Sequence, residues 1–429
     1  MKISDPTPPV KNKITIDERI LKYAEKAEAN CALRFSEIAR ISRFNGEKVL
    51  NSFINSRMSA NCLTGTTGYG YGDIGRDTID KVFAEVFGAE DALVRHNFVS
   101  GTHAITVALF GILKAGDKLV SLTGSPYDTL KQGICGKADG SLSSFGITYE
   151  QSELLADGSA DLADIFLKVK TAKVGYIQRS KGYSLRPALT IAKLSEIIKS
   201  ARNANPDIVI LVDNCYGEFI ETSEPCDVGA DLVVGSLIKN PGGGIAETGG
   251  YIAGRAELVA KCADRLTAIG MGKEVGCSLN QNKPIAQGLF LAPETVASAL
   301  KTSAFAAEIF TLLGFKVFPK PGEKIGDIVT AIKMPDAQSL ISFCKGIQKG
   351  SPIDSHLTTE PWDMPGYDNK VIMAAGAFNM GASIEISCDA PIREPYIAYL
   401  QGGLTYPTGR LAVLSGLQEM LGNHSLKLF

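Results

Sequence analysis

Short runs of valine, isoleucine and leucine alternate with helical segments between residues 91 and 254. The apolar runs predict strands and the segments between them predict helices. Strands and helices that alternate in this way indicate a mostly parallel sheet covered by helices on both faces. Ligands of such α/β folds bind at the carboxyl ends of the strands, so we expect the chemistry in the loops that follow the apolar runs. The runs lie at residues 93–95, 118–122, 174–178, 208–213, 232–235 and 251–253.

The N-terminal region has a helical pattern instead. Thr15 and Glu18 form a capping box, which predicts the start of a long helix. Helix-forming residues continue to about Val49, and an Asn-Gly pair at 45–46 predicts a break. We therefore expect an N-terminal helical arm.

The segments after this arm suggest where the domains begin. A stretch rich in Gly, Thr and Tyr at 61–75 predicts a long loop, and a helix with one apolar face follows as far as Gly88. After residue 302, mixed helical and strand-like segments predict a smaller α+β domain. The predicted units are the helical arm (1–60), a large domain (61–302) and a small C-terminal domain (303–429).

Composition narrows the class of protein. The 429 residues are 45% apolar and 21% charged, which is ordinary for a globular chain. Lys and Arg total 44 against 46 Asp and Glu, so no basic excess favours nucleic acid as a partner. The nine cysteines contain no CxxC pair, which favours reduced thiols and disfavours a metal centre.

No segment of the sequence predicts membrane insertion or export. The apolar runs are far shorter than the ~20 residues that span a bilayer. The opening segment MKISDPTPPVKNK carries prolines and charges where a signal peptide would be apolar. We expect no membrane partner and a cytoplasmic location.

Lys239 and Asp213 each stand at or just after the end of a predicted strand. A lysine held near flexible Gly-Pro-Asn backbone can bond to an aldehyde cofactor if its ammonium is destabilised, which desolvation and a nearby cation both promote. Asp213 ends a strand expected to be buried, where a carboxylate needs a cation. The alternatives are a solvated surface lysine, and an Asx turn or helix N-cap at Asp213.

Two further strand ends carry polar side chains. Ser100, Gly101 and Thr102 lead into an apolar helix, and a helix N-terminus with a glycine offers free N–H groups and a favourable dipole to an anion. A plain N-cap at Ser100 is the alternative. Tyr127 lies in the loop after the strand at 118–122, where it either contacts a ligand or packs at the edge of the core.

Together these residues resemble those of fold-type I pyridoxal 5'-phosphate (PLP) enzymes of cysteine and methionine metabolism. The resemblance is strongest to the methionine gamma-lyase-like or aluminium resistance branch, which is similar to cystathionine beta-lyase, and it covers most of the chain. It implies the fold-type I architecture, with a seven-stranded, mostly parallel sheet and a smaller α+β C-terminal domain. The matching segments are GYGYGDIGRDTID (68–80), VSGTHAI (99–105), VDNCYGEF (212–219), GSLIKNPGGGIAETGGYIAG (235–254) and REPYIAYLQGGLTY (393–406).

The resemblance also implies the cofactor and its contacts. PLP would be bonded to Lys239, which then serves as the base that transfers protons. Asp213 would pair with the protonated pyridine nitrogen, and the Tyr127 ring would stack on the cofactor. The phosphate would be bound by Ser100, Gly101, Thr102 and Ser236.

The glycine-rich loop at 70–75 also fits the pattern G-x-G-x-x-G, but no apolar strand precedes it, which disfavours a dinucleotide site. In the resembled lyases a Tyr-x-Arg here reaches the phosphate of the neighbouring subunit. Tyr71 matches the tyrosine, whereas Asp73 stands at the arginine position and Arg76 is the predicted substitute. The resemblance therefore implies a homodimer or homotetramer with shared active sites.

Two arginines are candidates for the substrate carboxylate. Arg393 lies in the C-terminal domain, where the lyases use an arginine, and Arg179 follows the strand at 174–178; surface salt bridges are the alternative for both. The resemblance implies a lyase that breaks a carbon–sulfur bond of a sulfur-containing amino acid, of the cystathionine, methionine or cysteine type, by α,β- or α,γ-elimination. An aminotransferase, a γ-replacement enzyme or a non-catalytic PLP-binding protein linked to aluminium tolerance are the alternatives.

Overall fold

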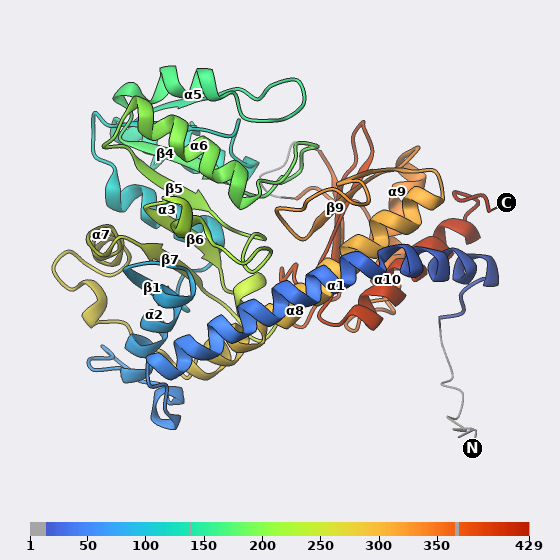
Figure 1. Ribbon diagram of the computed structural model, residues 1–429, viewed down its shortest axis with the longest axis horizontal. Coiled ribbons are helices and arrows are strands. Elements are labelled where there is room, and N and C mark those ends of the chain that lie inside the picture. Colours follow the sequence, from blue (N-terminus) through green and yellow to red (C-terminus); the bar gives the residue numbers. More distant parts are fainter. Residues whose placement is uncertain (1–13, 138, 365–368, 429) are drawn as a thin grey trace.

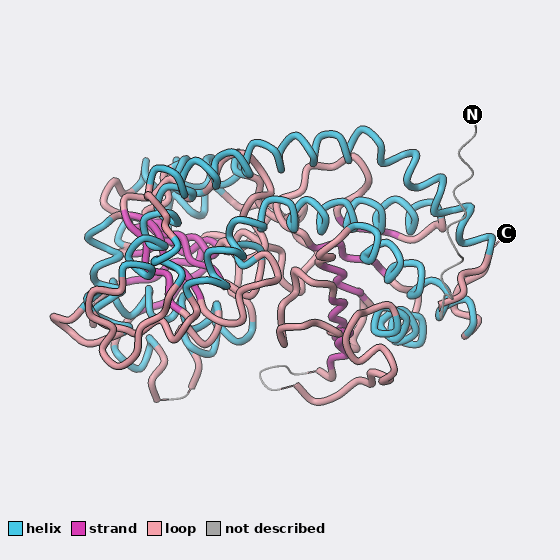
Figure 2. Tube along the Cα trace, turned by 90° about the horizontal axis from the view of Figure 1, so that it is seen from below, coloured by secondary structure: helices cyan, strands magenta, loops and turns pink. Residues whose placement is uncertain are grey.

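The structure, a computed structural model, describes residues 14–137, 139–364 and 369–428. It contains two sheets, each in a separate part of the molecule, and two long helices that contribute to the hydrophobic cores of both parts. These helices are α1 (Glu18–Asn55) and α8 (Asn282–Leu312), and they pack side by side along the molecule (Figures 1 and 2).

The larger sheet has seven strands in the order β1-β7-β6-β5-β4-β2-β3 within the described residues. Neighbouring strands from β6 to β3 are parallel, and β7 is antiparallel to both β6 and β1. The strands are β1 (Asp91–Arg95), β2 (Lys118–Ser121), β3 (Thr148–Gln151), β4 (Val174–Gln178), β5 (Val209–Asp213), β6 (Leu232–Ser236) and β7 (Gly250–Gly254).

The prediction of a mostly parallel sheet is confirmed, and each of the six apolar runs lies in a strand or extends no more than one residue beyond it. The sequence did not predict β3, whose residues Thr-Tyr-Glu-Gln contain no apolar run. This strand is at the edge of the sheet, and its residues are half-buried or exposed. Its side chains therefore do not need to be apolar.

Helices cover both faces of the larger sheet, because its strands present buried apolar side chains on both sides. One face packs against α3 (Gly101–Ile112), α4 (Asp128–Cys135) and α7 (Ala256–Leu266). The other packs against α8 and against α2 (Ile74–Val86), α5 (Leu162–Lys168) and α6 (Ile191–Ala204).

The smaller sheet is antiparallel, in the order β10-β11-β12-β9-β8, and packs with α9 (Ala337–Lys349) and α10 (Tyr406–Gly422). This arrangement agrees with the predicted α+β C-terminal part. The predicted division at residue 302 falls inside α8, and the exact domain limits stay a prediction. The strands are β8 (Lys316–Phe318), β9 (Val329–Lys333), β10 (Val371–Ala374), β11 (Ser387–Pro391) and β12 (Ile397–Gln401).

The N-terminal helix forms as predicted but differs at its start and middle. Asp17, not Thr15, caps it, because the Asp17 carboxylate accepts a hydrogen bond from the N–H of Arg19 at 2.8 Å. The predicted break at 45–46 is absent from this described helix. Asn45 is buried, and its side-chain amide donates to the main-chain oxygens of Phe219 and Glu221. These tertiary contacts stabilise the helix at Asn45-Gly46, where the intrinsic helix propensity is low.

No helix in the described part of the chain combines the length and apolar composition that a bilayer-spanning segment needs.

Candidate active site

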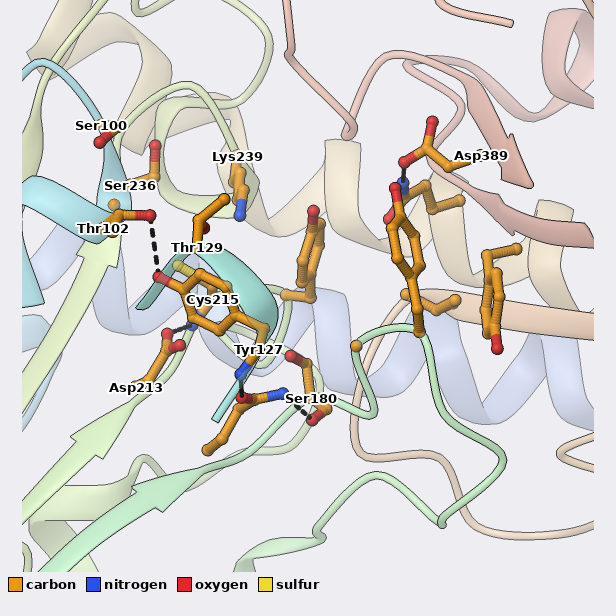
Figure 3. Close-up of a pocket in the computed structure, with 18 of the residues that line it drawn as sticks. Ser100, Thr102, Tyr127, Thr129, Ser180, Asp213, Cys215, Ser236, Lys239 and Asp389 are labelled. Carbon is orange, nitrogen blue, oxygen red and sulfur yellow. Dashed lines mark hydrogen bonds between the residues drawn. The ribbon is translucent and has the colours of Figure 1, made fainter. Parts of the chain in front are cut away.

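A cavity of about 270 Å³ lies where the carboxyl ends of the large-sheet strands face the small sheet (Figure 3). Four of its lining residues come from the small sheet, namely Val329, Asp389, Tyr399 and Gln401. The structure brings the predicted residues Ser100, Gly101, Thr102, Tyr127, Asp213, Ser236 and Lys239 to the opposite walls of the same cavity.

The N-terminus of α3 forms one end of this cavity. The Ser100 hydroxyl caps the helix by accepting a hydrogen bond from the N–H of His103 at 3.1 Å. This is the N-cap that was the alternative interpretation of Ser100. The N–H groups of the first turn have no partner within the helix itself. A Cβ on Gly101 would lie 3.3 Å from Sγ of Cys215 and 3.4 Å from Cβ of Ser236, so glycine keeps this corner open. The arrangement fits an anion such as a phosphate.

Asp213 at the end of β5 is a buried carboxylate, only 3% exposed. The Tyr176 hydroxyl donates to its Oδ2 at 3.3 Å, and the N–H of Cys215 donates to its Oδ1 at 3.1 Å. Burial raises the pKa of the carboxyl group, and the Lys239 ammonium only partly opposes this effect. No Lys, Arg or His nitrogen of the described chain lies within 4.0 Å of the carboxylate. The site therefore fits a ligand that brings a cationic nitrogen to this carboxylate.

Lys239 follows β6, and its Nζ lies 4.1 Å from the centre of the Tyr216 ring. The turn after it needs glycine, because a Cβ on Gly242 would lie 1.6 Å from the carbonyl oxygen of Leu237. Burial lowers the pKa of the lysine, but the nearby Cys215, Tyr216 and Asp213 outweigh burial and hold the pKa well above its usual value. A nucleophilic amine needs the opposite shift, and a cation paired with the Asp213 carboxylate would weaken this attraction.

Tyr127 is fixed at both ends. Its hydroxyl shares a hydrogen bond of 2.9 Å with Oγ1 of Thr102, and its N–H donates to Oε1 of Gln178 at 3.1 Å. Burial raises the pKa of the phenol, and the Asp213 charge adds to this shift, so the side chain stays neutral. Figure 3 shows the ring between Asp213 and Thr102, a position that suits stacking on a planar ligand.

The family model for methionine gamma-lyase matches residues 20–421. The chain belongs to the methionine gamma-lyase family. It is 46% identical to the protein YnbB of Bacillus subtilis (strain 168), over 95% of this chain and 98% of YnbB. A carbon–sulfur lyase involved in aluminium resistance, from Clostridium novyi NT, is 48% identical, with a TM-score of 0.91 over 94% of this chain and 96% of that one.

The predicted fold class is also confirmed by a distant structure. The PLP-dependent protein YhfS of Escherichia coli is only 17% identical, yet it superposes with a TM-score of 0.61 over 90% of this chain and 97% of its own. The chain therefore has the fold of the fold-type I enzymes as well as membership of the methionine gamma-lyase family.

Tyr216 is a cavity residue of this family member that the sequence reasoning missed. Its backbone has a φ of 70°, which is costly for a bulky side chain. Its ring faces Lys239, and its hydroxyl shares a hydrogen bond of 3.2 Å with Oγ of Ser383. The signal was its place three residues after Asp213, within the matching segment VDNCYGEF.

The two arginines predicted to bind substrate have different positions. Arg179 does not line the cavity: it is fully buried and donates to the main-chain oxygens of Leu189 and Gly217 and to Oδ1 of Asn214. This contradicts a role in binding the substrate carboxylate. Arg393 lines an adjoining cavity that shares Tyr127 with the first, and its role stays a prediction.

Arg76 holds the glycine-rich loop before α2. Arg76 is 3% exposed, and its guanidinium donates to the main-chain oxygens of Gly70 and Gly276, both at 2.9 Å. In this structure it therefore holds the loop from inside, and its predicted contact with a neighbour's phosphate stays a prediction. Tyr71 in the same loop is 64% exposed and stacks on Tyr69 with ring centres 5.6 Å apart.

Replacing Arg76 by alanine is expected to lower the free energy of unfolding by about 1.5–3 kcal/mol, the usual contribution of hydrogen bonds from a charged group. Urea unfolding followed by fluorescence measures this change. Arg43→Ala, at an exposed position on α1, is the matched control and should change it little. Equal unfolding midpoints for the two variants would show that Arg76 does not hold the loop.

Proposed function

We propose that this member of the methionine gamma-lyase family is a PLP-dependent carbon–sulfur lyase acting on a sulfur-containing amino acid. The observation that carries the proposal is the meeting of Lys239, the Asp213 carboxylate, the Tyr127 ring and the α3 N-terminus in one cavity. The identity to the Clostridium novyi carbon–sulfur lyase supports the reaction class.

In this proposal each wall of the cavity has one task. The first turn of α3 and the Ser236 hydroxyl bind the phosphate, and the Asp213 carboxylate pairs with the ring nitrogen. Tyr127 packs against the ring and keeps it in place. When bound, PLP supplies an electron sink for the negative charge that forms at the substrate's α-carbon.

Lys239 has two tasks in succession. Its Nζ would hold the cofactor, and the same amine would remove the proton from the substrate's α-carbon. Tyr216 lies against that amine and keeps it over the cavity. We propose Arg393, in the adjoining cavity, for the substrate carboxylate, because a guanidinium binds carboxylates in a bidentate manner.

Product analysis tests the proposed reaction. The PLP-loaded protein is incubated with L-methionine, L-cysteine and L-cystathionine, and pyruvate, 2-oxobutanoate and released thiol or sulfide are measured. An oxoacid formed together with a thiol or sulfide supports the lyase, with pyruvate indicating β-elimination and 2-oxobutanoate γ-elimination. Amino transfer without release of thiol would indicate an aminotransferase, and exchange of the γ-substituent would indicate a γ-replacement enzyme. No reaction at all would indicate a non-catalytic PLP-binding protein.

We also propose a homodimer or homotetramer in which subunits share active sites. The exposed Tyr71 supports this assembly, because a large aromatic side chain in a glycine-rich loop is a suitable contact for a neighbouring subunit. Dimer and tetramer are both compatible with the proposal. The cytoplasmic location expected from the sequence stays a prediction.

Subunit exchange tests the shared site. Lys239→Ala removes the lysine of its own site, whereas Tyr71→Ala should damage only the site of the neighbour. In a mixed dimer, one site carries both lesions and the other carries neither, so activity should return to about a quarter of wild type after equal mixing with random exchange. Co-purification of two tags confirms that mixed dimers form. Mixed dimers without activity would mean that Tyr71 acts within its own subunit, and a Tyr71→Ala protein that is fully active by itself would mean that Tyr71 has no role in the site.

A further inference from the structure

The small-sheet wall of the cavity carries a buried carboxylate that the proposed chemistry does not use. Asp389 on β11 is 7% exposed and lines the same cavity as Lys239. Figure 3 shows the two residues on opposite sides of the pocket. A ligand attached at Lys239 therefore has Asp389 at the other side of the space it occupies.

The hydrogen bonds of Asp389 are incomplete. Gln401 donates from Nε2 to Oδ2 at 2.9 Å, and the Tyr183 side chain acts with it to lower the pKa of the carboxyl group. Oδ1 is buried and has no hydrogen-bond partner among the described residues. No basic nitrogen of the described chain lies within 4.0 Å of the group. A buried carboxylate in this state is stabilised by a cation or a strong donor.

The neighbours of Asp389 suit a cation better than a second anion. Burial raises the pKa of its carboxyl group to about 6, partly offset by Tyr183 and Gln401, so the group is mainly ionised at neutral pH. Tyr183 and Tyr399 lie beside each other with ring centres 5.2 Å apart, and aromatic faces attract ammonium groups.

We infer that Asp389 binds a second ammonium group of the substrate, carried at the end of the substituent on sulfur. The inference rests on the proposed lyase function, because the substrate's α-amino group must then be at the Lys239 side of the cavity. The group that reaches Asp389 consequently belongs to the part that leaves with sulfur. The preferred substrate class is a thioether amino acid whose sulfur substituent ends in a primary amine.

Two probes isolate this ammonium group. S-(2-aminoethyl)-L-cysteine and S-propyl-L-cysteine have chains of equal length and differ only in a terminal ammonium or methyl group. In both, the α-proton is removed, the Cβ–S bond breaks and sulfur leaves with the electron pair and takes a proton. The remaining enamine reacts with water to give pyruvate and ammonium, so one pyruvate assay measures both. If cleavage is at the γ-carbon, the corresponding homocysteine thioethers and 2-oxobutanoate replace them.

The test compares kcat/KM for the two probes in the PLP-loaded wild type and in Asp389→Asn, which retains an acceptor for the Gln401 amide. Wild type should prefer the amine by about tenfold to a hundredfold, the range of a buried charge pair. Asp389→Asn should abolish that preference and leave the propyl substrate within about threefold of wild type. Asp363→Asn, at an 86% exposed side chain of the same part of the molecule, controls for net charge.

A binding measurement separates failure of this inference from failure of the proposed reaction. L-Lysine and L-2-aminoheptanoate are the sulfur-free counterparts of the two probes and cannot undergo the elimination. Calorimetric dissociation constants should favour lysine in wild type but not in Asp389→Asn. If binding shows this selectivity but neither thioether is turned over, the proposed lyase reaction is wrong and the inferred ammonium site at Asp389 stands. Equal use of both thioethers, unchanged in Asp389→Asn, would overturn the subsite and retain the lyase.

Discussion

Replacing Lys239 by alanine is expected to lower the turnover of the PLP-loaded protein by at least about 10²–10⁴-fold, the usual contribution of a positioned proton-transfer group. The loss should be larger if the covalent attachment also speeds substrate entry. The reason is that Nζ of Lys239, 4.1 Å from the centre of the Tyr216 ring, is the only side-chain amine among the described residues that line the cavity. Thiol and oxoacid formation under saturating substrate measures the effect.

The control for this variant is Lys193→Ala, which removes an exposed lysine on α6 whose partner is Glu196. It should retain wild-type turnover. Exogenous methylamine offers a second check, because a small amine can replace part of the missing proton transfer without restoring the side chain. A Lys239→Ala protein with wild-type turnover would exclude this lysine from the chemistry.

Replacing Asp213 by asparagine is expected to weaken PLP binding by about 10²–10⁴-fold, since removing one partner of a buried ion pair costs about 3–5 kcal/mol. Asparagine keeps the shape of the side chain and an acceptor for the N–H of Cys215 but removes the charge. Equilibrium dialysis with absorbance detection of the cofactor gives the affinity. Turnover should fall as well, because the ring nitrogen loses its anionic partner.

The same variant should not destabilise the cofactor-free protein. Burial raises the pKa of Asp213, so above its unfolded-state pKa the ionised group disfavours the folded state, and this unfavourable contribution grows until the pH exceeds the folded-state pKa. At neutral pH, Asp213→Asn is therefore expected to leave the free energy of unfolding unchanged or raise it. Weaker PLP binding together with lower stability would indicate a structural role, and unchanged PLP binding would contradict the pairing.

Much of this site could be predicted from the sequence because parallel strands carry their carboxyl ends to one edge of a sheet. Asp213 and Lys239 are 26 residues apart along the chain, yet β5 and β6 are adjacent and parallel, so both side chains come to the same cavity. These two strands are buried along their whole length and therefore consist mainly of apolar residues, which is the pattern that predicts a buried strand.

The errors have physical reasons of their own. The position of Arg179 after β4 predicts a place in the cavity, but its guanidinium is buried against the Glu221 and Glu224 carboxylates and nearby main-chain oxygens. The preceding Gln178 lines the cavity instead, since neighbouring residues of extended chain point in opposite directions. The sequence did not predict Asp389 and Gln401 as cavity residues, because no local pattern indicates that the small sheet faces the large one. They reach the cavity only through the tertiary arrangement of the two sheets.

The central claim is that Lys239 carries the cofactor, and borohydride reduction followed by peptide mass mapping tests it most directly. Reduction fixes the cofactor to the amine that holds it, and proteolysis then locates the label. The account predicts one pyridoxyl group on a single peptide, at Lys239, and no labelled lysine peptide from Lys239→Ala. A pyridoxyl group on another lysine, or none in a wild-type protein saturated with PLP, would contradict it.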